Sequence, residues 1–212
     1  LMSSDREAVM IALTGTPLIG DGYNTKDVFG EYIHKYYYNR SIADGYTLKL
    51  IREGIKTEYR AKLNAVLEEL EARKGSLSKK DVYAHPKYVA ALVDYIVDDF
   101  QHSRIALGDS TIGGMIVCDS SDQARMVDQE LNRYSQVSHI LILHDVEDKE
   151  TRRRYTDDFK KGKIDLLIVY NMLLTGFDAP RLKKQYLGRV IKEHNLLQTL
   201  TRVNRPYKAF RY

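Results

Sequence analysis

The feature that most constrains the fold of this chain is a regular alternation of short apolar runs and helix-like segments after residue 110. The apolar runs are Met115–Cys118, Ile140–Leu143 and Leu166–Val169. The segments between them carry apolar residues at helical spacing. Strands that alternate with helices of about twelve residues form βαβ units, with parallel strands and right-handed crossovers. The sequence therefore predicts an α/β domain in which helices flank a parallel sheet.

Two helices are predicted inside this unit. Ser120 and Gln123 have the spacing of a capping box, so the first helix begins there. The second extends from about Asp148 to Lys161, with Tyr155 and Phe159 as its apolar contacts. Both lie between strands, so each is expected to cover a face of the sheet.

Two further helices are predicted upstream of the sheet. Apolar residues recur at helical spacing from Glu58 to Lys74 and from about His85 to Arg104, where Pro86 is tolerated in the first turn. A polar, glycine-containing segment, 108–114, follows them. We interpret these helices as an insertion that connects two domains.

The first residues contain a strand-like run of their own. Residues 8–13 are continuously apolar and lead into the hydroxyl-rich turn Thr14–Pro17. Such a run is typical of a parallel strand that is buried on both faces. Because its sheet partners are largely missing, we expect the chain to begin inside a domain. Residues 28–55 are predicted to form short extended pieces with a turn at Asp44-Gly45.

Composition excludes several classes of protein. Charged residues make up 29% of the chain and nearly balance, at a net +4, which permits nucleic-acid binding without requiring it. The single cysteine, Cys118, lies in an apolar run, which predicts an inert core thiol and a reducing compartment. No apolar stretch is long enough to span a membrane, and no signal pattern is present. We therefore expect a cytoplasmic protein without membrane contact, and the scattered histidines predict no metal site.

The last predicted helix, His194–Arg205, has one polar and one apolar face. Gln198, Arg202 and Arg205 follow one another at i, i+4 and i+7, so they share one stripe at about 100° per residue. The stripe nearly opposite consists of Leu196, Leu200 and Val203. Because arginine keeps its charge and binds oxyanions in a fixed fork, the polar stripe is a candidate phosphate sensor. The alternative is an ordinary solvated helix face.

A second candidate site is the hexapeptide Thr175–Pro180, which follows the third apolar run. Ligands of open parallel sheets bind at the carboxyl ends of the strands. Gly176 allows close approach of the backbone, Thr175 can bond a phosphate, and Asp178 can accept from an arginine or a ribose hydroxyl. The alternative is an ordinary turn that ends at a proline.

In combination these features resemble superfamily 2 helicases and translocases. Thr14–Pro17, the strand at Met115, the hexapeptide Thr175–Pro180 and the glutamine-arginine stripe look like motifs III, IV, V and VI, in that order. A glycine often stands at the position of Thr201 in the commoner superfamily form. This difference favours a restriction-enzyme motor over a generic RNA helicase.

A narrower resemblance is to the motor subunit, or R subunit, of type I restriction-modification enzymes. It rests on residues 175–206, with the runs Leu187–Lys192 and Leu200–Pro206. Val28–Ile33 and Ile42–Gly45 also look like that family. The resemblance covers most of the chain and is weak between about 56 and 110.

The resemblance implies a motor in which two RecA-like domains close on ATP while DNA lies across both. Arg202 and Arg205 would be arginine fingers that reach the nucleotide phosphates on the first domain. Gln198 would orient that pair. Gly176 and Asp178 would line the nucleotide cleft between the domains.

The other motifs would serve DNA and domain movement. Thr175 would touch the DNA backbone. Thr14, Gly15 and Thr16 would couple the nucleotide state to movement of the domains. The implied partners are double-stranded DNA, the modification and specificity subunits, and the first RecA-like domain of the same polypeptide.

The resemblance also implies that the chain is divided into three parts. Residues 1–30 would be the remnant of the first RecA-like domain, 31–110 a mixed and helical connector, and 111–212 the second RecA-like domain. No G-x-x-x-x-G-K-[ST] loop, no Asp-Glu pair after an apolar strand and no nuclease carboxylates are found. We therefore expect this chain alone not to hydrolyse ATP. The intact subunit would be a deoxyribonuclease and translocase that uses ATP and Mg²⁺.

Two other hypotheses remain open. One is a DNA-repair or RNA helicase of the same superfamily, which an upstream nuclease domain would argue against. The other is a non-catalytic α/β module that holds nucleic acid or a protein. Steeply salt-dependent DNA binding without any motor domain would favour that module.

Overall fold

A computed structural model describes residues 9, 11–15, 17, 24–74, 79–174, 176–191 and 193–208 of the chain. Its centre is a parallel sheet of four strands in the order β2-β3-β1-β4. The strands are β1 (Gly113–Val117), β2 (His139–Ile142), β3 (Leu166–Val169) and β4 (Leu182–Leu187). The helices are α1 (Thr25–Phe29), α2 (Tyr38–Ala43), α3 (Thr57–Lys74), α4 (Lys79–Tyr83), α5 (Pro86–Ala106), α6 (Ser121–Leu131), α7 (Lys149–Lys160) and α8 (Glu193–Leu200).

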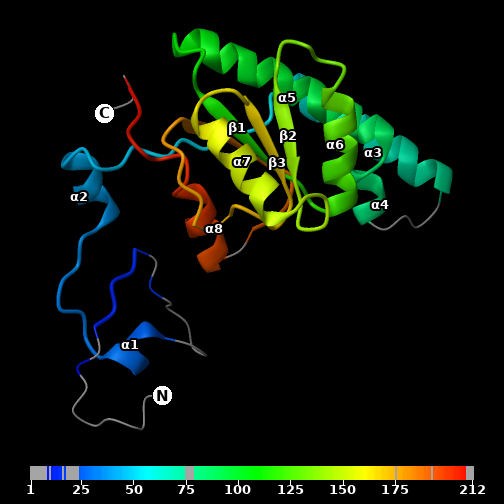
Figure 1. The fold of residues 1–212 in the computed structure, drawn as a ribbon. Helices are drawn as coiled ribbons and strands as arrows, with labels where there is room; N and C mark the ends of the chain where they lie inside the picture. Colours follow the sequence, from blue (N-terminus) through cyan, green and yellow to red (C-terminus); the bar gives the residue numbers. More distant parts are fainter. Residues whose placement is uncertain are drawn as a thin grey trace.

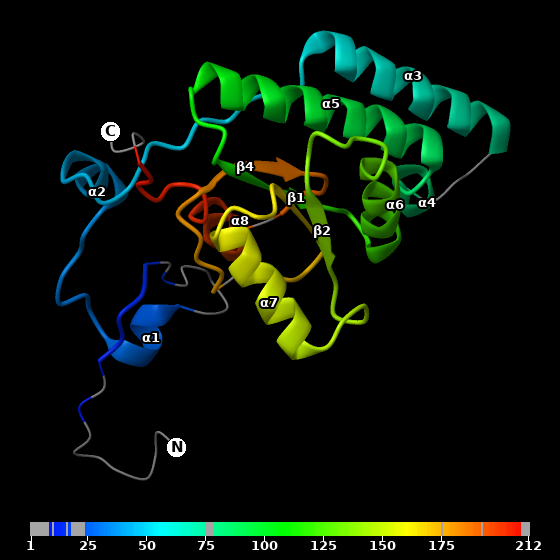
Figure 2. The same cartoon turned by 45° about the horizontal axis from the view of Figure 1, so that its top comes forward.

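The predicted fold class is confirmed, with helices on both faces of the sheet (Figures 1 and 2). Alternate residues of β1 enter two separate cores, because successive side chains of a strand point to opposite faces. Ile116 packs with α5 and α6, whereas Met115 and Val117 pack with α7 and with residues 174–179. Helix α3 lies outside α5 and adds a further layer on that face (Figure 2).

The sequence patterns located most of these elements. The predicted capping box exists: Ser120 Oγ accepts from the backbone N–H of Gln123 at 3.1 Å. The Gln123 side chain completes the box by accepting from the N–H of Asp119 at 2.6 Å, one residue before the usual position. Strand β4 was not predicted, because lysines and a glutamine interrupt its apolar pattern at the edge of the sheet.

Helix α5 falls inside the predicted connector, yet it is built into the core of the sheet. Its buried residues, among them Val93, Ile96 and Phe100, share one cluster with Ile116 and Ile168 of the sheet. The division of the chain at residue 110 stays a prediction.

The predicted strand near the start of the chain is wrong where the structure describes those residues. Val9, Ile11 and Leu13 belong to no strand and are exposed, because no described strand lies beside them to form a sheet. Residues 28–55 contain the end of α1 and all of α2, and form no described strand. Both helices stand apart from the sheet (Figures 1 and 2). The turn at Asp44-Gly45 is confirmed, with Gly45 at a φ of 75°.

Within the described residues, none of the helices combines the length and the apolar character needed to cross a bilayer.

The buried guanidinium of Arg181 gives a stability prediction. It donates to the carbonyls of Thr111 (2.8 Å), Phe159 (2.7 Å) and Ile164 (2.6 Å). In Arg181→Met these buried acceptors lose their donor, so the free energy of unfolding should fall by about 2–4 kcal/mol. Denaturant unfolding measures this loss. The matched control is Arg133→Met, which breaks the ion pair of an exposed arginine with Glu130 and should leave the free energy of unfolding nearly unchanged.

Candidate functional site

The candidate arginines lie in a turn that follows α8, not on the helix itself. The prediction of one helix through Arg205 is wrong, because α8 ends at Leu200. The next N–H groups make tighter i→i−3 bonds, from Arg202 to Thr199 and from Val203 to Leu200. Pro206 lies beyond them and cannot continue a helix.

Arg202 fastens this turn to the segment between β3 and β4. Its Nη1 donates to the carbonyl of Phe177 at 3.0 Å, and its Nε donates to the carbonyl of Gln198 at 3.0 Å. Burial lowers the pKa of Arg202 and the nearby charge of Arg205 lowers it further, although Asp178 opposes this. An arginine still remains charged near neutral pH, because its ordinary pKa lies far above that range.

Arg205 is the more available of the two guanidinium groups. Its Nη1 lies 2.7 Å from Oδ2 of Asp178, and the two side chains are 42% and 51% exposed. An ion pair so open to water holds its partners only weakly. The carboxylate therefore orients the arginine without sequestering it.

Hydrogen bonds from two other segments, at Lys183 and at Leu48, also hold the backbone of the turn. Lys183 of β4 donates through Nζ to the carbonyl of Arg205. The N–H of Leu48 donates to the carbonyl of Asn204, a buried residue between the arginines, at 2.5 Å. No sequence pattern marked Lys183 or Leu48, and the run Leu200–Pro206 gave Asn204 no role of its own, because these roles come from contacts between distant segments.

The position of Lys183 shows where the site lies on the sheet. Lys183 is the second residue of β4, so the arginine turn passes the amino end of that strand. We expected the site at the carboxyl ends of the strands, and that expectation is wrong for these contacts. The physical reason is that the segment 170–181 crosses from the carboxyl end of β3 to the amino end of β4, and Phe177 and Asp178 lie near its far end.

The remaining predicted residues are placed as follows. Gly176 is exposed and has a φ of 71°, a left-handed conformation that favours glycine. Gln198 meets Arg202 through its backbone carbonyl. Thr14 and Gly15 are exposed and take no part in the arginine contacts given above. Thr16 and Thr175 lie outside the described residues.

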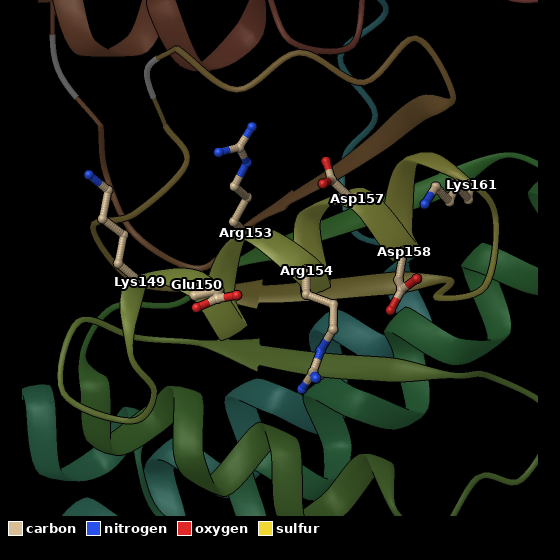
Figure 3. A pocket seen from close by; sticks show the side chains of 7 residues that line it. All are labelled: Lys149, Glu150, Arg153, Arg154, Asp157, Asp158 and Lys161. Carbon is tan, nitrogen blue, oxygen red and sulfur yellow. The ribbon is translucent and has the colours of Figure 1, made fainter.

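A shallow groove of about 670 Å³ follows α7 and is lined only by charged side chains (Figure 3). Its residues are Lys149, Glu150, Arg153, Arg154, Asp157, Asp158 and Lys161. Arg153 and Arg154 leave the helix in opposite directions (Figure 3). Because both signs of charge are mixed along it, this groove is not selective for an anion. The described residues include no group of three or more His, Cys, Asp or Glu side chains that could hold a metal ion.

Comparison with known proteins identifies the family. Residues 77–211 match the family model described as type I restriction enzyme subunit R domain 3. This chain belongs to the R subunits of type I restriction enzymes. Residues 3–82 match a second family model, described as SWI2/SNF2 ATPase. The resemblance seen in the sequence is thereby confirmed, and it favours the restriction-enzyme hypothesis over a repair or RNA helicase.

The relatives of this R-subunit chain are longer proteins. A putative type I restriction enzyme endonuclease subunit of Methanocaldococcus jannaschii is 28% identical, with 94% of this chain and 24% of the relative covered. A type I restriction enzyme endonuclease subunit of Staphylococcus aureus is 26% identical, with 96% and 27% covered. The chain thus spans about a quarter of the curated relatives it matches.

A solved structure supports the fold of the R-subunit chain. It is the fragment structure of a putative HsdR subunit of a type I restriction enzyme from Vibrio vulnificus YJ016. The match has a TM-score of 0.61 at 18% identity and covers 93% of this chain and 36% of that one.

The two arginines should differ in their effect on stability. Arg202→Met removes two hydrogen bonds to backbone carbonyls and should lower the free energy of unfolding by about 1–2 kcal/mol. Arg205→Met breaks an exposed ion pair and should lower it by at most about 1 kcal/mol. Denaturant unfolding of both variants makes the comparison. Equal losses would contradict the anchoring role of Arg202.

Lys183 gives a prediction on pH. Burial, and then the charge of Arg205, lower its pKa from 10.5 to about 8, so between those values the unfolded chain binds more protons. Stability from this group therefore rises as the pH increases from about 8 to about 10. Relative to Lys183→Met, the wild type should become more stable over that interval. A constant difference between the two proteins would contradict the lowered pKa.

Proposed function

We propose that this chain is part of the ATP-driven double-stranded DNA translocase of a type I restriction endonuclease. Its membership of the R-subunit family and the SWI2/SNF2 ATPase match of its first residues support this role. The longer relatives are named as endonuclease subunits. In the intact protein, DNA and the modification and specificity subunits would be the partners.

The exposed pair of Arg205 and Asp178 carries the proposal. A surface ion pair contributes only about 0–1 kcal/mol, so a polyphosphate can replace the carboxylate at little cost. Arg202 fixes the turn to the carbonyl of Phe177, and Lys183 holds the carbonyl of Arg205. The Arg205 guanidinium is therefore presented on an anchored backbone and remains free to change partners.

Arg202 and Arg205, the two predicted arginine fingers, would have different roles. Arg205 would approach the phosphates, whereas Arg202 would hold the backbone and add positive charge behind it. Gln198 would support Arg202 through its carbonyl. Gly176 and Asp178 would line the cleft opposite the first RecA-like domain.

The remaining roles follow from the same proposal. Thr175 would contact the DNA backbone, and Thr14, Gly15 and Thr16 would link the nucleotide state to domain movement. ATP and Mg²⁺ would be used by the intact subunit, in the cytoplasm, and this chain alone would be inactive. When bound, the nucleotide would supply the phosphates that Arg205 stabilises as negative charge develops on them.

Arg205→Ala in the intact subunit tests the proposal. DNA-stimulated ATP turnover should fall by about 10³-fold or more, because an arginine finger contributes about 10³–10⁵ in related phosphoryl-transfer systems. Nucleotide binding, measured by equilibrium titration, should remain close to that of the wild type. The control is Arg154→Ala, an exposed arginine on α7. Wild-type turnover in Arg205→Ala would refute the role of Arg205.

A further inference from the structure

Arg189 lies at the end of β4 opposite to the arginine turn. The strand ends at Leu187, and the N–H of Gly188 then donates to the carbonyl of Val117 at 2.8 Å. A Cβ on Gly188 would lie 3.0 Å from that carbonyl oxygen, so the chain passes close over the end of β1. This close passage brings Arg189 to the carboxyl edge of the sheet.

The side chain of Arg189 reaches across that edge. Its Cζ lies 4.9 Å from the ring centroid of Tyr170, the residue that directly follows β3. In the sheet order, β1 stands between β4 and β3, so the arginine spans the end of the central strand. The tyrosine ring restrains the guanidinium at this edge of the sheet.

None of the described residues accepts a hydrogen bond from Arg189. Its Nε is buried without a hydrogen-bond partner, and no ion pair within the described residues includes it. Asp119 lies near this edge, because its charge raises the pKa of Cys118 while the charge of Arg189 lowers it. No ion pair within the described residues joins the Asp119 carboxylate to Arg189. Burial raises the pKa of Cys118 to about 12, so that thiol is neutral and is not an anionic partner.

This edge is where an open parallel sheet binds ligands. From β1 the chain runs through α6 to β2 on one side, whereas β4 lies on the other side of β1. Such a switch point leaves a crevice outside the carboxyl ends of the strands. An arginine at that crevice with no acceptor among the described residues is suited to an oxyanion, which a guanidinium binds through its N–H donors, here the terminal Nη groups because Nε is buried.

We propose that Arg189 binds a phosphate of the DNA backbone. This inference rests on the proposed function, because it takes DNA as the substrate of the motor. A nucleotide phosphate has the same chemistry, but Arg205 serves it at the other end of β4. From Lys183 to the end of the strand at Leu187 the chain advances four residues, or about 13 Å at 3.3 Å per residue, and Arg189 lies beyond that end, so the two sites stand a strand's length apart.

The test measures DNA binding by the intact subunit with Arg189→Gln. The affinity for a double-stranded oligonucleotide is measured by fluorescence anisotropy over a series of salt concentrations. Loss of one phosphate contact should reduce the slope of log K against log salt by about 0.9, and the affinity should fall about tenfold at 0.1 M salt. The affinity for ATP should stay unchanged.

Arg154→Gln is the matched control, because Arg154 also stacks on a tyrosine, with its Cζ 5.6 Å from the Tyr155 ring. The proposal would be overturned if Arg189→Gln kept the wild-type slope of log K against log salt. It would also be overturned if Arg189→Gln and Arg154→Gln changed that slope equally. A fall in ATP affinity with an unchanged slope would assign the phosphate to the nucleotide and also overturn it.

Two further variants keep the outcome unambiguous. If Arg189→Gln does not fold, Arg189→Lys keeps the charge but loses the fork, so its DNA affinity should fall while the salt slope is retained. Unchanged affinity in a folded Arg189→Lys would overturn the proposal. Arg205→Ala should keep the wild-type DNA salt slope, so failure of the nucleotide role, seen as normal ATP turnover, is distinguishable from failure at Arg189.

Discussion

The candidate site depends on the crossover between β3 and β4, which contains no helix. This segment lies on the same face of the sheet as α7, and the rings of Phe177 and Phe159 pack at 5.9 Å between centroids. The packing fixes the backbone at Phe177, whose carbonyl then accepts from Arg202. A helix there would have used that carbonyl internally. The irregular crossover therefore supplies both the anchor for one arginine and the carboxylate for the other.

Strand β4 separates two positively charged places. At its amino end, Lys183 and Arg202 hold the turn that presents Arg205, and the acceptors are carbonyls and one carboxylate. At its carboxyl end, Arg189 lies over a tyrosine ring, and its Nε has no hydrogen-bond partner among the described residues. Under the roles proposed above, the two places would bind the phosphates of different ligands, and the length of β4 would separate them.

The contact between Leu48 and Asn204 links the two family matches within the chain. Leu48 lies in the segment that matches the SWI2/SNF2 ATPase model, and Asn204 lies in the R-subunit domain, between the arginines. A backbone hydrogen bond at this point ties the position of residues 47–50 to that of the arginine turn.

The sequence by itself determined the class of fold, three of the four strands, the helices α3, α5, α6 and α7, and the arginines as candidates, because these follow from local periodicity and motif spacing. Only the tertiary structure decided the end of α8 at Leu200, the edge strand β4 and the contacts of Lys183, Leu48 and Arg189. These features arise where segments far apart in sequence meet, and local propensity carries no information about such meetings. The helical periodicity predicted a helix through Arg205 and was wrong for the same reason. Hydrogen bonds from Arg202 to Phe177 and from Lys183 to Arg205 stabilise a non-helical turn in place of a continued helix.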